Sequence, residues 1–371
     1  MRFVHQDKLI LPLHWRAPES TFLAPGIYFC SARDLVLLGL ELQPLVIWAS
    51  QNERMEISVV VPTFNRRKIV LRTVGALLAQ NLPCADYEII VVVDGSTDGT
   101  SEALRSVQSD CRIRVIEQQN RGPSAARNTG FRAAAANLVL FLDDDMLADP
   151  GLVKGHIAAH AGPGRYIAFG ALYLSPDCPF TLAAECFNRE IGAFYLERNR
   201  NPQLDWHIED CVFSNASLSR ALLEEIGGFD EAFRKREDLE LGIRLFHSGA
   251  QPRYIHSAVA RQYSEKTSAD LISDAEAFAE ADVRLARKHP EVAVKGQLHW
   301  LAREPRWKLY LLRAAAAVPA FVDLCLAPVC ACSEVGLRIP AFRNLGVRVL
   351  QLRRRIHWYR KALELGWQRP E

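Results

Sequence analysis

The stretch "NLVLFLDDDMLADP", residues 137–150, decides the fold. Its apolar run is typical of a strand buried on both faces, as in a parallel sheet. Three consecutive carboxylates, Asp143, Asp144 and Asp145, follow at once. Because ligands bind at the carboxyl ends of strands in open α/β sheets, the stretch predicts a functional acidic cluster at that edge.

Two earlier segments repeat this pattern. "ISVVVPTFN" at 57–65 and "YEIIVVVDGSTDGT" at 87–100 are apolar runs that end in polar residues, and "RRKIVLRTVGALLAQN" at 66–81 has helical spacing. This alternation predicts βαβ units and a mostly parallel sheet. We expect the polar clusters 63–66, 94–98 and 143–145 to converge.

The alternation weakens after residue 150. Residues 162–175 predict one or two strands, 213–233 a strand and a short helix, 236–250 a helix, and 252–263 a last strand. An amphipathic helix is expected within 270–300. The fold class is therefore α/β, an open and mostly parallel sheet flanked by helices, with a helical C-terminal extension.

The C-terminal region combines apolar and basic segments. Residues 314–332 are apolar but contain Asp323 and two prolines, so they predict a poor membrane-spanning helix. The segment 337–371 is basic and carries Trp358, Tyr359 and Trp367, which suits an anionic membrane surface. A cationic helix packed on the domain is the alternative.

Composition narrows the function classes. Lys plus Arg total 45 against 43 Asp plus Glu, so no global polyanion-binding signal exists. Nine scattered cysteines without a CxxC pair predict reduced thiols in a cytosolic protein, with no redox or zinc role. No GxGxxG follows a strand and no P-loop motif occurs, while "RRR" at 353–355 is weak as a nucleic-acid patch.

Four regions follow from these patterns. Residues 1–55 are either an N-terminal extension, with Met55 as the natural start, or an ordinary packed prefix. Residues 56–150 form the half of the predicted domain in which strands and helices alternate regularly, residues 151–265 form the half in which this alternation weakens, and residues 266–371 form a helical region that is a candidate for membrane association.

The acidic cluster predicts a metal. Adjacent carboxylates at a strand end raise each other's pKa unless a cation neutralises them. Mg²⁺ or Mn²⁺ typically uses one or two carboxylates together with substrate phosphates. Asp143 and Asp145, one residue apart, would point to the same side of a continuing strand. An acidic N-terminal helix cap before "LADPGLVKG" is the alternative interpretation.

Six motifs in one order carry a family resemblance. They are "VVPTFN" at 60–65, "VVVDGSTDGT" at 91–100, "GPSAARNTG" at 122–130, "FLDDDMLADP" at 141–150, "GGFDEAF" at 227–233 and "REDLELGIRL" at 236–245. Over about residues 56–262 the chain resembles the family 2 glycosyltransferases of GT-A fold. These are inverting enzymes that use nucleotide-diphosphate sugars.

The resemblance implies that residues 56–150 bind the nucleotide sugar and that residues 151–265 bind the acceptor and carry the catalytic base. It also implies roles for individual residues. Asp143 and Asp145 match the metal-binding DxD pair, with Asp145 favoured. Asp238, with Glu237 beside it, matches the general base, although an acidic helix cap is the alternative. Donor binding is implied for a larger set: Pro62, Thr63, Phe64, Asp94, Gly95, Ser96, Arg127 and Asp144.

One motif departs from the family pattern. Many members carry histidine after the last core strand, where it approaches the metal. This chain has Arg261 and Gln262 near that place, so the third metal ligand is open and Arg261 is a candidate for the phosphate. His256 is expected to be an ordinary strand-end residue.

The sequence thus predicts an inverting, metal-dependent glycosyltransferase with a UDP-sugar donor. The expected acceptor is a glycan or a lipid-linked saccharide, as in cell-surface polysaccharide biosynthesis. The expected location is the cytoplasmic face of the cell membrane, without nucleic-acid partners. Two alternatives stay open: a non-catalytic protein of the same fold that binds sugar nucleotides or glycans, and a sugar nucleotidyltransferase, which would more naturally carry a glycine-rich triphosphate loop.

Overall fold

The computed structural model describes residues 55–201, 204, 206–207, 210–291 and 304–367, together with two short strands, β1 (Leu9–Ile10) and β2 (Phe29–Cys30). These two strands pair antiparallel with each other. The interpretations of residues 1–55 lie almost entirely outside the described residues. Residues 54–371 belong to one compact unit, which contains the sheet and all the described helices.

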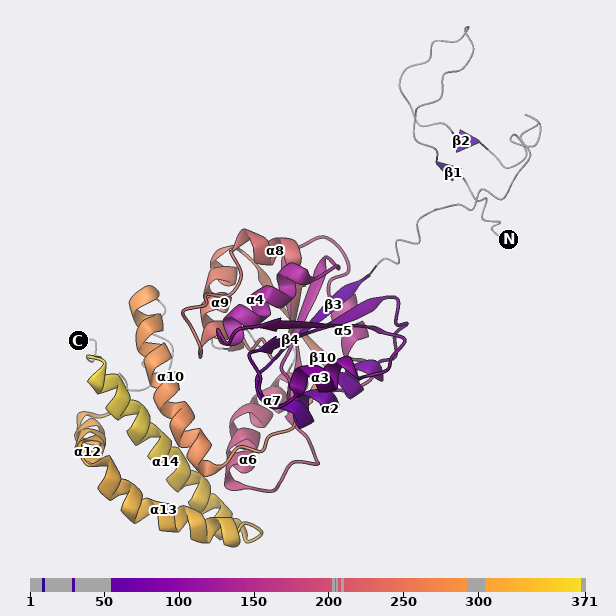
Figure 1. Ribbon diagram of the computed structural model, residues 1–371. Coiled ribbons are helices and arrows are strands. Elements are labelled where there is room, and N and C mark those ends of the chain that lie inside the picture. The colour runs from indigo at the N-terminus through magenta and orange to yellow at the C-terminus, as the bar shows by residue number, and fades with distance from the viewer. Residues whose placement is uncertain are drawn as a thin grey trace. The chain divides into compact units, whose positions relative to one another are not determined.

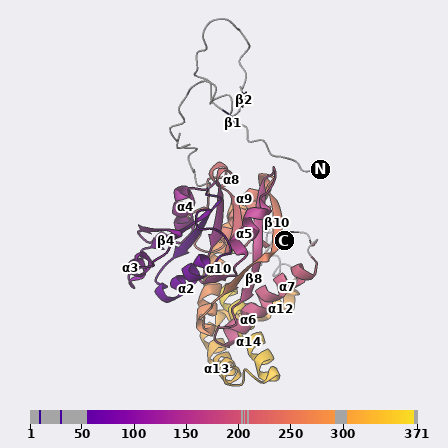
Figure 2. The same ribbon diagram turned by 90° about the vertical axis from the view of Figure 1, so that its right-hand side faces the viewer.

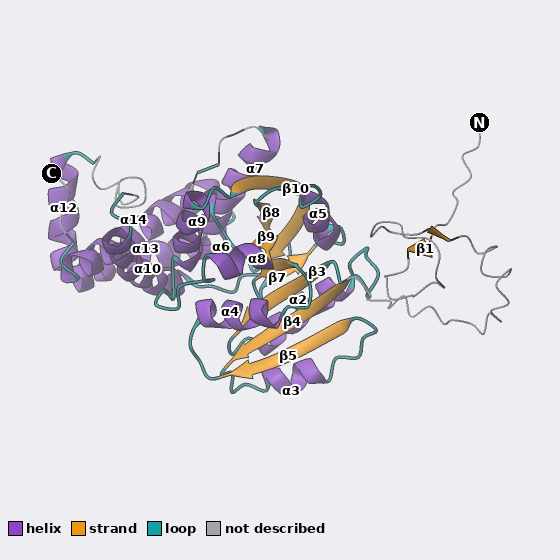
Figure 3. Ribbon diagram, turned by 90° about the horizontal axis from the view of Figure 1, so that it is seen from above, coloured by secondary structure: helices purple, strands orange, loops and turns teal. Residues whose placement is uncertain are grey.

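An eight-stranded sheet is the centre of this unit, in the order β5-β4-β3-β6-β9-β8-β10-β7 over the described residues. Four neighbouring pairs are parallel: β3 with β4, β3 with β6, β4 with β5, and β8 with β10. Strand β9 is antiparallel to β6 and β8, and β7 is antiparallel to β10. Figure 3 shows β5, β4 and β3 side by side. The predicted open, mostly parallel sheet is confirmed. The strands are β3 (Ile57–Thr63), β4 (Tyr87–Asp94), β5 (Arg112–Gln118), β6 (Leu138–Leu142), β7 (Met146–Ala148), β8 (Tyr166–Leu174), β9 (Asn215–Ser219) and β10 (Gln251–Gln262).

Helices cover both faces of the sheet (Figure 1). On one face lie α2 (Arg67–Leu78), α3 (Thr100–Arg105) and α5 (Leu152–Ala159), and on the other α4 (Pro123–Ala133), α8 (Arg220–Glu225) and α9 (Glu237–His247). Successive strand side chains alternate between the two cores: Val59 and Val61 pack with α2, whereas Val60 packs with α4. Helix α4 approaches β3 closely because Gly130 has no side chain; a Cβ there would lie 2.2 Å from Val60 Cγ1.

A segment without a clear sequence signal lies between β8 and β9. It forms α6 (Leu182–Phe187), the π-helical turn η1 (Asn188–Gly192) and α7 (Ala193–Arg200). Thr181 caps α6 by accepting a hydrogen bond from the Ala184 amide at 3.1 Å. Helix α6 packs against the C-terminal helix α14, and Figure 2 shows the two close together. The segment therefore joins the sheet to the C-terminal region.

The C-terminal region contains α10 (Ser268–Lys288), α12 (Arg306–Ala317), α13 (Pro319–Val335) and α14 (Pro340–Glu364). Helices α10, α12 and α13 all pack on α14. The amphipathic helix expected within 270–300 is α10, and residues 292–303 lie outside the described residues. Among the described helices, none is both long and apolar enough to cross a bilayer by itself; α12 and α13 pass that test only as a pair, and they meet at a 97° bend.

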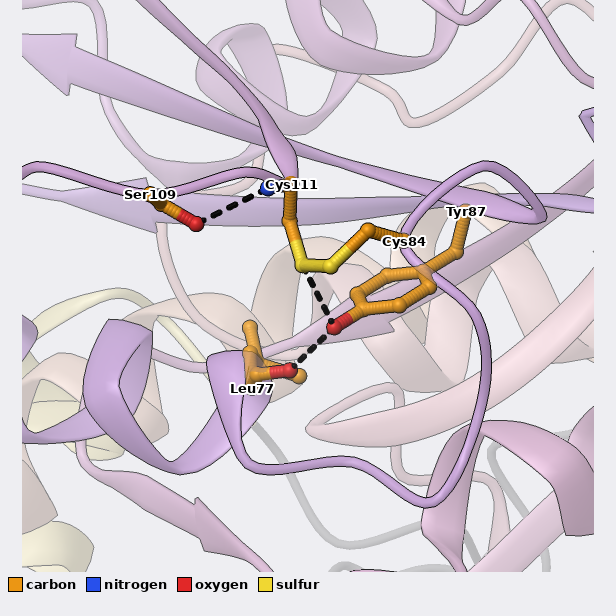
Figure 4. Close-up of a disulfide and its surroundings, with 5 residues drawn as sticks. All are labelled: Leu77, Cys84, Tyr87, Ser109 and Cys111. Carbon is orange, nitrogen blue, oxygen red and sulfur yellow. Dashed lines mark hydrogen bonds between the residues drawn. A yellow bond between two sulfur atoms is a disulfide. The ribbon is translucent and has the colours of Figure 1, made fainter.

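The prediction that the cysteines are reduced thiols is wrong for one pair. Cys84 and Cys111 form a disulfide, and their Cα atoms lie 4.5 Å apart (Figure 4). Cys84 precedes β4 and Cys111 precedes β5, so the parallel pairing of these strands brings the two loops together. A separation of 27 residues carries no sequence signal of such a pairing. Cys178, Cys186, Cys325, Cys330 and Cys332 are free cysteines.

Candidate active site

The three polar clusters at the strand ends converge as predicted. Strand β3 lies between β4 and β6, so its end stands between the other two clusters. Thr63 Oγ1 donates a hydrogen bond to Asp144 Oδ2 at 2.7 Å, and the Asn65 amide donates to Ser96 Oγ at 2.8 Å. The clusters are thereby connected into one edge of the sheet.

Arg66 neutralises part of the acidic cluster. Its guanidinium lies 2.8 Å from Asp144 Oδ1 and 3.2 Å from Asp145 Oδ2. Burial, together with the charges of Asp145 and Asp143, raises the pKa of Asp144 to about 7, although Arg66 and Thr63 oppose the rise. Burial also raises the pKa of Asp145. Two buried carboxylates share one arginine, so the cluster favours a further cation.

The donor set around Asp145 fits a hard divalent ion. Asp145 Oδ1 is buried and makes no hydrogen bond, whereas its Oδ2 accepts one from Gln262 Nε2 at 3.1 Å. Across the described residues, no group of three or more His, Cys, Asp or Glu side chains is arranged to hold a metal ion by itself. An ion held by a carboxylate and completed by substrate phosphates is the arrangement that Mg²⁺ and Mn²⁺ commonly adopt.

Asp143 is engaged differently from Asp145. Its Oδ1 accepts a hydrogen bond from Arg127 at 2.7 Å and its Oδ2 accepts one from Ser214 Oγ at 2.6 Å. Burial alone would raise the pKa of Asp143, but Arg127 and Ser214 hold it below its ordinary value. Asp143 therefore remains ionised, and a metal would have to share its oxygens with these two donors.

Arg127 joins the strand ends to α9. It projects from α4, is almost fully buried, and also donates to Glu237 Oε1 at 2.8 Å. Asp238 Oδ1 lies 3.8 Å from the same guanidinium. Burial works against the charge of Arg127, but Asp143, Asp238 and Glu237 raise its pKa above the ordinary value. One fixed cation thus holds the predicted metal-binding and base residues in a single cluster.

Asp238 lies in the first turn of α9 with one oxygen unused. Its Oδ2 accepts a hydrogen bond from the Phe213 amide at 2.9 Å, while Oδ1 is buried without a hydrogen-bond partner. Burial and the neighbouring carboxylates Glu237 and Asp143 raise the pKa of Asp238 to about 7, although Arg127 opposes the rise. A carboxylate with a free oxygen and a pKa near neutrality has the properties of a general base.

Asp94 holds a loop in place. Its carboxylate accepts hydrogen bonds from Gln118 Nε2 at 2.7 Å, from the Arg121 amide at 2.9 Å and from the Gly122 amide at 2.8 Å. Gly95 follows with φ of 79°, and a Cβ there would lie 2.8 Å from the Asn120 amide nitrogen. The proposed role of Asp94 in donor binding stays a prediction.

The aromatic position predicted beside the nucleobase is open to solvent. Phe64, directly after β3, is 45% exposed. Pro62 lies near the end of the same strand, next to Thr63. An exposed ring at this edge is available for stacking on a planar ligand.

The sequence interpretation assigned no individual role to three residues of the site, although it placed Arg66 in the converging cluster 63–66 and Gln262 near the position of the third metal ligand. Arg66, Ser214 and Gln262 each contact an aspartate of the acidic cluster. Gln262 lies where many family members have histidine, and this position was the only sequence feature that indicated a role near the metal. Arg261, a candidate for the phosphate, instead pairs with Asp149 through two contacts of 2.9 Å, and His256 is exposed.

Comparison with known proteins agrees with this geometry. Residues 58–227 match the model of "Glycosyl transferase family 2". The chain is 35% identical over 218 residues to a validoxylamine A glucosyltransferase of Streptomyces hygroscopicus subsp. jinggangensis, which is 52% of each protein. It is 30% identical to the chondroitin synthase of Escherichia coli, over 58% of this chain and 37% of the synthase. The chain spans about half the length of these relatives or less.

A solved structure supports the fold. A mannosyltransferase from Pyrobaculum calidifontis, in complex with GDP-Man and Mn²⁺, superposes with a TM-score of 0.56 at 20% identity, over 85% of this chain and 88% of that one. Residues 58–227 thus match the family 2 glycosyltransferases in sequence, and the unit that contains them has the GT-A fold.

Proposed function

We propose that this protein is an inverting glycosyltransferase that moves a sugar from a nucleotide-diphosphate donor to an acceptor hydroxyl. The observation that carries the proposal is the state of Asp238, which is buried, has an oxygen without a hydrogen bond and has a pKa raised to about 7. Arg127 connects this carboxylate to Asp143 at the strand ends. A base and a phosphate-binding edge thus belong to one cluster.

The donor would occupy the strand-end edge. Phe64 would stack on the base, Asp94 would accept hydrogen bonds from base or ribose, and Pro62, Thr63, Gly95, Ser96, Arg127 and Asp144 would complete the pocket. Asp145 and Asp143 would hold Mn²⁺ or Mg²⁺, which, when bound, stabilises the charge of the departing diphosphate. The mannosyltransferase complex with GDP-Man and Mn²⁺ supports this class of donor. Among the nucleotides, the family resemblance favours UDP.

The chemical step then falls to residues of this chain. As the acceptor oxygen attacks the anomeric carbon from the face opposite the nucleotide, Asp238 Oδ1 takes its proton. The bond from the anomeric carbon to the diphosphate oxygen breaks, and the electron pair leaves with the nucleoside diphosphate. Arg127 holds the Glu237 and Asp143 side chains in fixed positions during this step because it donates a hydrogen bond to each.

We further propose that residues 151–265 bind the acceptor, which is a glycan or a lipid-linked saccharide. The chondroitin synthase among the relatives supports a glycan. Residues 266–371 would contact a membrane surface peripherally. The Cys84–Cys111 disulfide weighs against a strongly reducing compartment, because such compartments keep most thiols reduced.

Donor hydrolysis tests the proposal. The purified protein is incubated with a panel of nucleotide sugars and Mn²⁺ or Mg²⁺, and free nucleoside diphosphate is measured for wild type, Asp145→Asn and Asp238→Asn. We expect one donor to be hydrolysed, with a loss of about 10²-fold or more in both variants. Asp110→Asn, at an exposed aspartate before β5, is the matched control. Absence of metal-dependent nucleotide binding in calorimetry would contradict the donor site.

A further inference from the structure

The outer face of α12 is apolar and uncovered. Its exposed side chains recur with helical spacing at Trp307, Tyr310, Leu311 and Ala314, and Tyr310 is 72% exposed. The opposite face of α12 packs into the cluster that α10 and α14 form, through residues such as Ala316. The helix therefore has two apolar faces, of which only one has a partner within the described residues.

Helix α13 continues this surface. An exposed stripe without a charged side chain runs along the whole helix, and its two most exposed large members are Leu324 at 72% and Val335 at 93%. The full stripe is Phe321, Leu324, Cys325, Pro328, Ala331, Cys332 and Val335. Contiguous exposed apolar surface of this kind marks an interaction site. We call the exposed faces of α12 and α13 together the apolar L.

The charges around the apolar L have one sign. Within residues 304–348, all of which the structure describes, five cations are exposed: Arg306, Lys308, Arg313, Arg338 and Arg348. The acidic residues of this range are only partly exposed, and each has a partner. Glu304 pairs with Lys308 at 2.9 Å, Asp323 pairs with Arg353 at 2.8 Å, and Glu334 accepts from the Leu182 amide at 3.1 Å. The rim of the surface is therefore cationic.

We propose that the apolar L lies flat on an anionic lipid bilayer. Apolar side chains would enter the headgroup boundary while the surrounding cations contact lipid phosphates, as in interfacial amphipathic helices. Trp307 and Tyr310 are of the residue types that favour this depth. Neither arm is by itself long and apolar enough to cross the bilayer, and the two arms meet at 97°, so an in-plane placement lets both arms contact the lipid along their length.

The same charges disfavour a second copy of this chain as the occupant. Two copies joined through the apolar L would bring their cationic rims together, and such like-charge contacts oppose association. The inference rests on the peripheral membrane contact proposed above, and it names the surface and its orientation. It is separable from the donor chemistry, because no residue of the apolar L belongs to the candidate active site.

Vesicle flotation with the full-length protein tests the surface. Vesicles contain either phosphatidylcholine alone or equal parts of phosphatidylcholine and phosphatidylglycerol. We expect flotation with the anionic vesicles, and a decrease of about tenfold in apparent affinity for Phe321→Ser/Leu324→Gln and for Arg306→Gln/Arg313→Gln. Leu196→Gln, at a 47% exposed leucine of α7, is the matched control and should bind like wild type. Intrinsic fluorescence should also shift to the blue on binding, and Trp307→Phe should reduce this shift.

Several outcomes would overturn the inference. Equal binding to both kinds of vesicle would exclude an anionic surface as the specific partner. A dimer in light scattering that Phe321→Ser/Leu324→Gln dissociates would assign the face to a second copy. Nucleotide binding by calorimetry separates the two proposals: vesicle binding with no nucleotide binding would keep the surface and remove the donor site. Far-ultraviolet circular dichroism checks that each variant is folded.

Discussion

At the residue scale, Asp238 and Asp144 show what burial does to a carboxylate at a strand-end edge. Burial is the largest cause that raises the pKa of both to about 7. Their surroundings differ, because Asp144 has Thr63 and Arg66 as direct partners while Asp238 Oδ1 has no hydrogen bond. The first carboxylate is held by two side chains, and the second has one buried oxygen without a hydrogen bond.

The raised pKa of Asp238 predicts the pH dependence of the reaction. Below pH 7 the carboxyl group of the free enzyme is protonated and cannot accept a proton, so kcat/KM should fall as pH falls through about 7 and level off above it. Rates of donor turnover between pH 5 and 9 measure this limb. Asp144→Asn is the control. If the fall in rate at low pH comes from Asp238, it persists in the residual activity of this variant. If the limb disappears in that variant, Asp144 is the titrating group.

Arg66 should stabilise the fold through the acidic cluster. Replacement by methionine keeps the length of the side chain but leaves Asp144 and Asp145 without their cation, and we expect a loss of about 1–2 kcal/mol, since Arg66 is one-third exposed. Asp144 ionises only above about pH 7, so the loss should be greater at pH 8 than at pH 5. Urea unfolding at both values measures it.

The neighbouring arginine provides the comparison for Arg66. Arg67 is exposed and bonds Asp98 through its backbone amide, so Arg67→Met should change stability little. Mn²⁺ should restore part of the loss in Arg66→Met, because it supplies the missing positive charge. Equal losses at pH 5 and pH 8 would show that Arg66 acts by packing and not by charge.

At the scale of elements, α10 controls the turn that carries Glu237 and Asp238. Arg236 precedes them with φ of 61°, a backbone conformation that is uncommon for a residue with a side chain. Its guanidinium pairs with Asp282 of α10 at 2.7 Å, and Trp358 of α14 donates to the same carboxylate at 2.9 Å. The C-terminal helices thereby hold the start of α9.

Asp282 is therefore predicted to be a positioning residue. Asp282→Asn weakens the hold on Arg236, so kcat should fall about tenfold while the KM for the donor stays unchanged. The apparent pKa of the pH profile should also move, because the surroundings of Asp238 loosen. Steady-state kinetics of Glu280→Gln, at an exposed acidic residue of the same helix, gives the matched comparison. Unchanged kinetics in Asp282→Asn would mean that the turn before α9 keeps its conformation without the Asp282 carboxylate.

The elements also show what sequence could and could not predict. Strands β3, β4 and β6 have apolar runs that are visible without the structure, and their polar ends indicated the site. The short strand β7 and the helices α6 and α7 lack such a pattern. Their conformation depends on partners far along the chain, as in the contact of α6 with α14. For the same reason the individual contacts of Gln262 and Arg66 were not predicted, since they arise only where β10 and the residue before α2 meet the acidic cluster after β6.

At the scale of the whole molecule, the disulfide makes stability depend on redox conditions. Cys84→Ser/Cys111→Ser removes a bridge across 27 residues, and we expect a loss of about 3 kcal/mol. Thermal unfolding with and without dithiothreitol measures it: wild type should become less stable in the reductant, and the double variant should not respond. Cys325→Ser, at an exposed free cysteine, is the control. A wild type that is indifferent to the reductant would show that the bridge is dispensable.

The bend between α12 and α13 has a mechanical consequence. A body that rests on a single line can roll about that line, whereas two lines at 97° define a plane and stop the rolling. An enzyme seated on both arms would keep its catalytic edge at one height and one tilt above the lipid. Asp238 would then lie at a fixed height above the bilayer, and the enzyme would select acceptor hydroxyls that lie at this height.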